Sequence, residues 1–265
     1  MRYFDIDGNE FTQDAWKWVN NLLGEITNRL QKLDRKISRK LNKINSGKGG
    51  NGTRKSLAKL QSKKTGLNEV QGEIGLLAAS DQLYDVKEFS GSKVVGNQQI
   101  SSSQTTYDKN TDAIVINLNL ASNNQIATFA HELKHAFQFE TGKVAFSYFS
   151  GRGASGINDI TDEIEGYKRG QLFGANASAN INEAWVRKRT GRYDTPLGPY
   201  DINSYRTDAF GNLKTYGETF LDAAYTAGSI GRMPGSNTTV VRGWKASYIG
   251  GAKQYLKKTV GDWIK

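Results

Sequence analysis

The sequence has no cysteine, only two histidines and only three prolines among its 265 residues. Without cysteine, neither a disulfide framework nor a thiolate metal site can form, so a metal site must be built from histidine and carboxylate side chains. No apolar run approaches the roughly 20 residues that a membrane-spanning helix needs. The first residues, MRYFDIDGNEF, lack the basic-then-apolar order of a signal peptide. We therefore expect a soluble globular chain that is made in the cytoplasm without a signal peptide.

Both histidines lie in one short segment, TFAHELKHAFQF, at residues 128–139. His131 and His135 are four residues apart and Glu132 follows the first, which is the His-Glu-x-x-His pattern of zinc hydrolases. On a helix both imidazoles lie on one face and can bind one zinc ion. Glu132 then flanks the metal and can take a proton from a zinc-bound water. The spacing predicts a Zn²⁺ site with Glu132 as general base.

The surrounding residues favour the helix that this motif requires. Ser122 or Asn123 is expected to cap its start, and Gly142 to end it in a left-handed conformation. A stripe of apolar residues with helical spacing is expected to be buried beside the histidines: Ile126, Ala130, Leu133 and Phe137.

Two apolar stripes with helical spacing occupy the N-terminal part of the chain, at residues 16–44 and 57–77. The glycine-rich NSGKGGNGT, residues 45–53, separates them. We expect an antiparallel helical hairpin, because the charged residues lie mostly away from the two apolar stripes.

The net charge of +10 comes from this hairpin. Residues 28–64 contain 13 Lys or Arg and the single acidic residue Asp34, a net of +12, so the other residues sum to 10 − 12 = −2. Two interpretations are open: a surface that binds nucleic acid, anionic lipid or an acidic protein, or the solvated outer face of two amphipathic helices. The sequence alone does not favour a nucleic-acid partner.

Strand patterns follow the hairpin. LYDVKEF (83–89) alternates loosely, and TTYDKNTDAIVINLNL (105–120) predicts a β-hairpin that leads into the motif helix. The alternation of Ile114, Ile116 and Leu118 fits a strand with one buried face. Such a strand is either an ordinary half-buried strand or one whose edge pairs with an extended peptide.

A catalytic zinc ion takes three protein ligands, and no third histidine exists, so the third ligand should be a carboxylate. The best candidates lie in INDITDEIEGYKRGQLFG (157–174), a helix expected to be capped by Asp159 or Thr161. Asp159 and Asp162 are weaker ligand candidates, and they are also candidates to orient a ligating ring.

Two glutamates of this helix compete for the ligand position. Glu163 shares a face with Gly166 and Gly170, where small residues let another helix approach closely, whereas Glu165 shares its face with mostly solvated residue types. We predict Glu163, because a metal ligand must project from the packed face.

The two motifs together resemble a known family. HELKH followed by DEIEGY is similar to the gluzincin branch of zinc metallopeptidases, in which a downstream glutamate has a small residue three positions later, as Glu163 and Gly166 do. AHELKHAFQFETG and DITDEIEGYKRGQLFG resemble the metallopeptidase toxin domains at the C-terminal ends of RHS-type polymorphic toxins and related secreted bacterial effectors. RYFDIDGNEF resembles the Asp-Pro-Asp-Gly segment that ends an RHS core, with Ile6 in place of the proline. Residues 175–265 show no resemblance.

The resemblance implies an α+β fold: a zincin-like metallopeptidase domain (81–265) with a small sheet beside the motif helix. A basic helical hairpin (1–80) is expected to precede it, either as a pre-toxin or linker region or as an arm packed against the catalytic domain. It also implies that His131, His135 and Glu163 hold Zn²⁺ and that Glu132 activates the water that attacks a peptide carbonyl. The implied partners are a protein substrate, an immunity or inhibitor protein, and a secretion system or RHS carrier that exports the chain into target cells.

The oxyanion formed in such a reaction needs a hydrogen-bond donor, and without a third histidine we expect a tyrosine or arginine. Tyr167 lies one turn after Glu163 on the same face, which makes it the candidate catalytic donor; the alternative is a core aromatic packed beside the motif helix. The sequence does not rank Tyr148, Tyr200 and Tyr216.

Two other functions are compatible with the sequence. One is a nucleic-acid- or membrane-binding toxin module that uses the hairpin and carries a structural metal. The other is a zinc hydrolase acting on a non-peptide amide. In the C-terminal third, helices are expected at residues 180–191 and 218–228, and the many aromatic residues there are expected to complete a core.

Overall fold

In the computed structural model the described residues are 11–80, 82–95, 98–108, 110–111, 113–141, 145–148, 155–157 and 160–190, followed by short strands. The helices are α1 (Gln13–Asn45), α2 (Asn51–Ala78), α3 (Gln125–Glu140), α4 (Ile160–Leu172) and α5 (Glu183–Thr190). The first strands are β1 (Leu83–Phe89), β2 (Lys93–Val95), β3 (Gln98–Ile100), β4 (Gln104–Asp108) and β5 (Ala113–Asn119). The remaining strands are β6 (Ala145–Tyr148), β7 (Ser155–Ile157), β8 (Tyr205–Thr207), β9 (Leu213–Thr215), β10 (Thr239–Arg242), β11 (Ser247–Ile249) and β12 (Ala252–Gln254).

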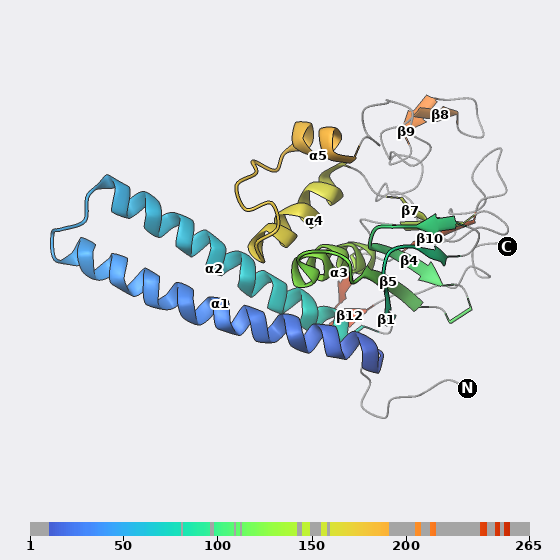
Figure 1. Cartoon of the computed structure of the whole chain (residues 1–265), viewed down its shortest axis with the longest axis horizontal. Helices are drawn as coiled ribbons and strands as arrows, with labels where there is room; N and C mark the ends of the chain where they lie inside the picture. The colour runs from blue at the N-terminus through green and yellow to red at the C-terminus, as the bar shows by residue number, and fades with distance from the viewer. Residues whose placement is uncertain are drawn as a thin grey trace.

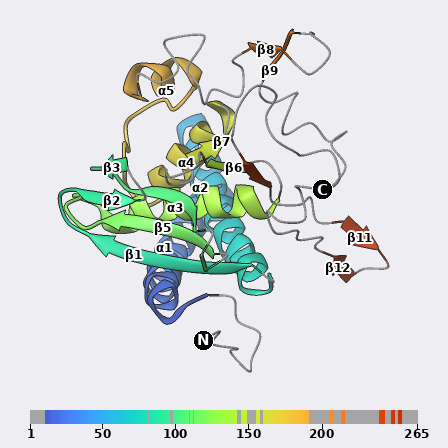
Figure 2. The same cartoon turned by 90° about the vertical axis from the view of Figure 1, so that its right-hand side faces the viewer.

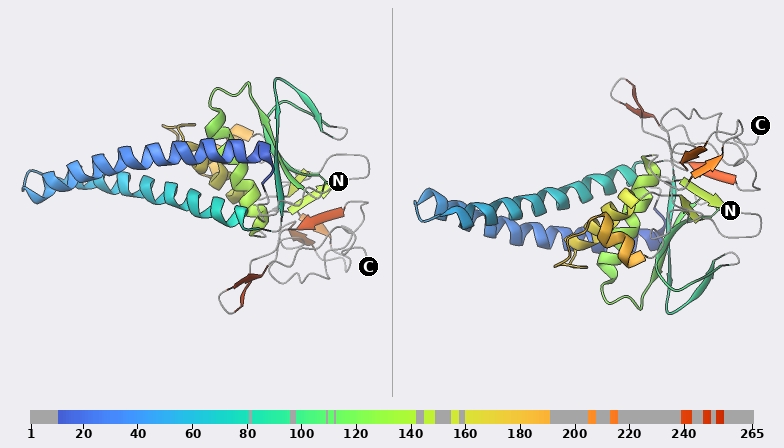
Figure 3. Two further views of the ribbon diagram at one scale, coloured as in Figure 1. Left: turned by 90° about the horizontal axis from the view of Figure 1, so that it is seen from below. Right: turned by 90° about the horizontal axis from the view of Figure 1, so that it is seen from above.

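The predicted helical hairpin is confirmed: α1 and α2 run antiparallel and extend far beyond the rest of the molecule (Figure 1 and Figure 3). Thr12 caps α1 by accepting a hydrogen bond from the amide of Ala15. The break is shorter than NSGKGGNGT suggests, because α2 already begins at Asn51 with Gly50 as its N-cap. We call residues 28–64 the basic arm, and residues 13–26 with 67–78 the hairpin base.

The first sheet has the strand order β1-β5-β4, with β1 parallel and β4 antiparallel to β5. The predicted β4–β5 hairpin is therefore confirmed, and β1 adds a parallel partner. The prediction that β5 has only one buried face is wrong, because all seven of its residues are buried. Ile114, Ile116 and Leu118 face the main core, while on the other face Asn117 accepts a hydrogen bond from Lys93 of β2. A peptide cannot pair with β5, because β1 and β4 occupy both of its sides.

The core joins the sheet to three helices. Figure 2 looks along the hairpin and shows α3 beside the β1–β5 pair. The hairpin base packs into the same core: Trp18 of α1 lies with its ring centroid 5.7 Å from that of Phe129 of α3. Fully buried side chains come from every layer, namely Leu22, Ile26, Leu67, Leu77, Tyr84, Ile114, Leu118 and Phe129. The hairpin base and the sheet thus share one apolar interior.

The fold class predicted from the sequence, α+β, is confirmed by this mixture of helices and small sheets. The second sheet has the order β10-β6-β7. Within the described ranges, none of the helices is long and apolar enough to cross a membrane. The predicted helix at residues 218–228 lies outside the described residues, as does Gly191, whereas the helix predicted at 180–191 is present as α5.

Candidate metal centre

Helix α3 carries the His-Glu-x-x-His motif, as predicted. Its N-cap is Asn124, whose side chain accepts a hydrogen bond from the amide of Ala127, so the predicted cap at Ser122 or Asn123 is one or two residues too early. The helix ends at Glu140, and Gly142 lies outside the described residues. His131 and His135 are neighbours on one side of the helix, with their Nε2 atoms 3.1 Å apart.

Helix α4 brings Glu163 to the two histidines. One carboxylate oxygen lies 3.7 Å from Nε2 of His131, and the other lies 3.6 Å from Nε2 of His135. The predicted cap at Thr161 is wrong, because Thr161 lies inside the helix, and Asp159 lies outside the described residues. Of the two competing glutamates, the structure therefore brings Glu163 to the histidines.

The close approach of α3 and α4 depends on glycine. A Cβ atom on Gly166 would lie 3.0–3.2 Å from three atoms of the His131 ring, and one on Gly170 would lie 3.1 Å from the carbonyl oxygen of Ala127. The sequence-based prediction that small residues permit helix contact here is therefore confirmed in geometric detail. Any larger side chain at Gly166 would displace the ring of His131.

One ligand atom from each of His131, His135 and Glu163 can be chosen so that all three lie within 4.8 Å of one another. Ligands about 2.0–2.1 Å from a tetrahedral metal ion are separated from each other by about 3.3–3.4 Å. The two Nε2 atoms are 3.1 Å apart, and each lies 3.6–3.7 Å from one oxygen of the Glu163 carboxylate, so the separations are close to that value. Two imidazoles and one carboxylate therefore fit a single metal ion with an open fourth position.

Comparison with known families agrees with this geometry. A family model described as "Putative metallopeptidase family (DUF6782)" matches residues 59–150. This match supports a metallopeptidase-like domain. It covers 92 of the 265 residues, about a third of the chain, and extends from residue 59 in α2 through the histidine motif. Among curated proteins and solved structures, no significant match was found.

The metallopeptidase-like assignment implies a hydrolase that uses a metal ion, and the family match contains three of the site residues. His131, Glu132 and His135 lie inside the matched segment, whereas Glu163 lies 13 residues beyond its end. The glutamate is therefore connected to the motif by the geometry of α3 and α4, independently of the family match.

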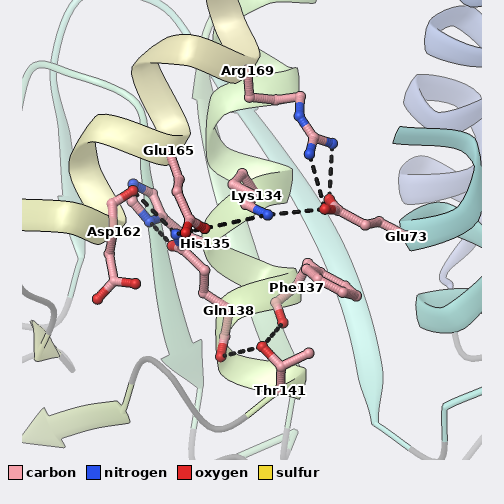
Figure 4. A network of polar contacts seen from close by, with 9 residues as sticks. All are labelled: Glu73, Lys134, His135, Phe137, Gln138, Thr141, Asp162, Glu165 and Arg169. Atoms are coloured by element: carbon pink, nitrogen blue, oxygen red, sulfur yellow. Dashed lines mark hydrogen bonds and ion pairs between the residues drawn. The ribbon is translucent and has the colours of Figure 1, made fainter. Parts of the chain in front are cut away.

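The orientation of His135 is set by Gln138, one turn further along α3. Nδ1 of His135 lies 2.7 Å from the amide oxygen of Gln138. The amide nitrogen of Gln138 donates to the carbonyl oxygen of Asp162 and to the carboxylate of Glu165 (Figure 4). Because the nitrogen faces two acceptors, the oxygen must face the ring, and Nδ1–H of His135 donates to it. Nε2 is then left with its lone pair directed toward His131 and Glu163.

Sequence reasoning missed this role of Gln138. Asp162, one of the two aspartates considered for orienting a ligating ring, meets Gln138 through its backbone carbonyl, which accepts a hydrogen bond from the Gln138 amide. The signal was present as a spacing: Gln138 lies three residues after His135, so the two side chains share a helix face. Glu165 does not face the metal centre and instead contacts Gln138 and Lys134.

His131 is held by packing rather than by a side-chain amide. Its ring packs against Gly166 and meets the ring of Tyr167 edge-on, with centroids 4.7 Å apart. Tyr167 in turn packs against Trp185 of α5, and the guanidinium of Arg189 lies over both rings. Burial and the nearby His135 lower the pKa of His131 to about 4, so this ring is neutral at ordinary pH.

Glu132 of α3 lies against strand β4. The hydroxyl of Thr105 donates to its carboxylate at 2.9 Å and to its backbone carbonyl at 2.8 Å. Burial raises the pKa of Glu132 to about 7, against the opposing effects of His135 and Thr105. Burial acts to lower the pKa of His135, but the carboxylates of Glu163 and Glu132 raise it overall. The site thus holds a carboxylate whose affinity for a proton is well above that of an exposed glutamate.

A cluster of ion pairs ties the two ligand-carrying helices to the hairpin base (Figure 4). Glu73 of α2 accepts from both terminal guanidinium nitrogens of Arg169 of α4, at 2.8 and 2.9 Å, and also lies 2.9 Å from Nζ of Lys134 of α3. Lys134 reaches Glu165 at 3.4 Å. These side chains are largely buried, with 8–16% exposure for Arg169, Lys134 and Glu73. One carboxylate from the hairpin therefore fixes α3 and α4 relative to each other.

Proposed function

We propose that this chain is a zinc-dependent endopeptidase of the gluzincin type with a zincin-like domain. The observation that carries the proposal is the convergence of His131, His135 and Glu163 beside the buried Glu132. Two imidazoles and one carboxylate, with no thiolate, form a typical donor set of a catalytic zinc site. In such a site the metal, when bound, polarises a carbonyl oxygen and lowers the pKa of water.

The chain's own groups supply the proton transfers of peptide hydrolysis. Glu132 takes a proton from the attacking water, and then delivers it to the nitrogen of the leaving amine. The burial of Glu132, which acts to raise its pKa, favours this role because it strengthens the carboxylate as a proton acceptor. Thr105 holds Glu132 in one orientation throughout. His131, His135 and Glu163 serve as the ligands.

Tyr167 is the proposed donor to the oxyanion of the tetrahedral intermediate. Burial raises the pKa of its phenol, so the hydroxyl keeps its proton and can donate a hydrogen bond. The contact of its ring with His131 also gives it a packing role. Tyr167→Phe separates the two roles: it preserves the ring and should keep the metal bound, while kcat falls about 10²-fold if the hydroxyl stabilises the oxyanion.

On the resemblance of the two site motifs alone, we further propose that the enzyme is a secreted bacterial effector or toxin of the polymorphic-toxin type. A specialised secretion system or RHS carrier would deliver it, a protein of the target cell would be its substrate, and an immunity protein would restrain it in the producing cell. The support for this part of the proposal is the similarity of the sequence segments.

Metal analysis of four proteins tests the proposal: wild type, Glu132→Gln, Glu163→Ala and Glu165→Ala. We expect one zinc per wild-type chain, retained in Glu132→Gln with hydrolysis of an unfolded protein substrate abolished, and lost in Glu163→Ala. Glu165→Ala is the matched control on the same helix, because it removes a carboxylate that faces Lys134 and Gln138 instead of the histidines. A wild type without stoichiometric metal would refute the proposal, and metal-dependent hydrolysis restricted to non-peptide amides would redirect it to an amidase.

A further inference from the structure

The charge of the basic arm is arranged on one side. In α1, Arg29 is followed at spacings of three or four residues by lysines that continue along one helix face: Lys32, Lys36, Lys40 and Lys43. In α2 the same spacing, read back from Gly66 toward the tip of the hairpin, gives a second row: Lys63, Lys59 and Lys55. Each row therefore stays on a single face of its helix.

Contacts at the foot of the arm show that both rows lie on the same side of the hairpin. The guanidinium of Arg29, at the start of the first row, donates to the carbonyl oxygens of Leu172 and Phe173. A Cβ atom on Gly66, at the end of the second row, would lie 3.1 Å from the side chain of Leu172. Both rows therefore begin against the same segment at the end of α4. We call the seven lysines of these rows the lysine face.

The acidic residue of the arm lies elsewhere. Asp34 pairs with Lys64 at 2.6 Å, and neither residue belongs to the two rows. Apart from Arg29 and Lys64, no cation of the arm has an ion pair with any described residue of the chain. The lysine face therefore presents seven ammonium groups without acidic neighbours on the same side, in two rows about 8–10 Å apart as packed helices are.

We propose that the lysine face binds the phosphate backbone of a nucleic-acid duplex. A duplex carries about one negative charge per 1.7 Å of its axis, a density that two parallel rows of cations complement. Lysine is a point charge, which suits contacts to phosphate that do not depend on base sequence. This surface is independent of the proposed peptidase chemistry, since none of its residues touches the metal centre.

The surroundings of the lysine face favour a duplex over a membrane. Residues 28–64 contain no aromatic residue, and Leu41, 39% exposed, is the only large exposed hydrophobic side chain among them. A helix that lies on a bilayer buries an aromatic or leucine-rich face.

Binding of a fluorescein-labelled DNA duplex of about 24 base pairs to the full chain, followed by fluorescence anisotropy, tests the proposal. Raising NaCl from about 50 to 200 mM should weaken binding by about 10³-fold if six or seven lysines contact phosphates. The double variant Lys36→Glu/Lys59→Glu should weaken binding at least tenfold at a fixed salt concentration, and should lower the salt slope by about 2.

The matched control is Arg35→Glu/Arg54→Glu, which changes the net charge equally at arm positions outside the two rows. It should change the affinity less than about threefold, and unchanged thermal unfolding of both variants would show that the helices persist. Equal losses in both variants would overturn the proposal, since overall charge would then explain the binding. So would binding to phosphatidylserine vesicles without binding to the duplex, or displacement of the duplex by polyglutamate at equal charge concentration.

Discussion

The two halves of the helical hairpin have the same secondary structure but opposite surroundings. In the hairpin base, Leu22 and Leu77 are fully buried in the core shared with the sheet and α3, and Glu73 is bound by cations from α3 and α4. In the basic arm, by contrast, the helices contact mainly each other and their lysines face solvent. The base is therefore part of the structure that holds the metal centre, whereas the arm is a separate surface formed by the same two helices.

The largest expected effect comes from removing the carboxylate that joins the base to the site. Glu73→Ala leaves Arg169 without its bidentate partner in a largely buried position, which should destabilise the fold by about 3–5 kcal/mol. The control in the arm is Asp34→Ala, which breaks an exposed pair and should cost about 0–1 kcal/mol. Urea unfolding measures both. Similar costs for the two variants would remove the distinction between base and arm.

Leucines of α1 provide the corresponding test for apolar packing. Leu22→Ala opens a cavity in the shared core and should cost about 2–5 kcal/mol. Leu41, which is 39% exposed in the arm, should tolerate the same change at a cost below about 1 kcal/mol. Thermal unfolding of the two variants compares them directly, and a cost for Leu41→Ala above that for Leu22→Ala would contradict the assigned burial.

A smaller and more local effect is expected at Gln138, which contacts both the metal ligand His135 and Glu165 of the ion-pair cluster. Gln138→Leu keeps the approximate size of the side chain but removes the acceptor for Nδ1–H of His135, so metal affinity should fall by about 10–100-fold. Gln61→Leu, at an exposed position of the arm, should leave the affinity unchanged. Competition with a chromogenic chelator measures both, and an unaltered affinity in Gln138→Leu would mean that packing alone orients His135.

Sequence reasoning recovered those parts of the molecule that depend on local spacing. The hairpin, the β4–β5 pair, the motif helix and the convergence of Glu163 on the histidines all follow from periods of two or of three to four residues. It did not recover the burial of both faces of β5, because the covering of the second face depends on β2, a strand of another sheet whose Lys93 donates to Asn117. Nor could it place the two lysine rows on one side, since this requires Leu172 to contact Arg29 and Gly66 together.

The smallest expected effect on the fold comes from removing most of the arm. Asp34 and Lys64 face each other at 2.6 Å, so a short glycine-serine turn can join them in place of residues 35–63. Because the deleted segment packs mainly on itself, the unfolding free energy should change by no more than about 1 kcal/mol, and zinc should remain bound at one per chain. Duplex binding should be lost, since six of the seven lysines of the lysine face are deleted. Loss of the metal in this variant would mean that the arm supports the site. The hairpin base and the basic arm would then form one cooperative unit.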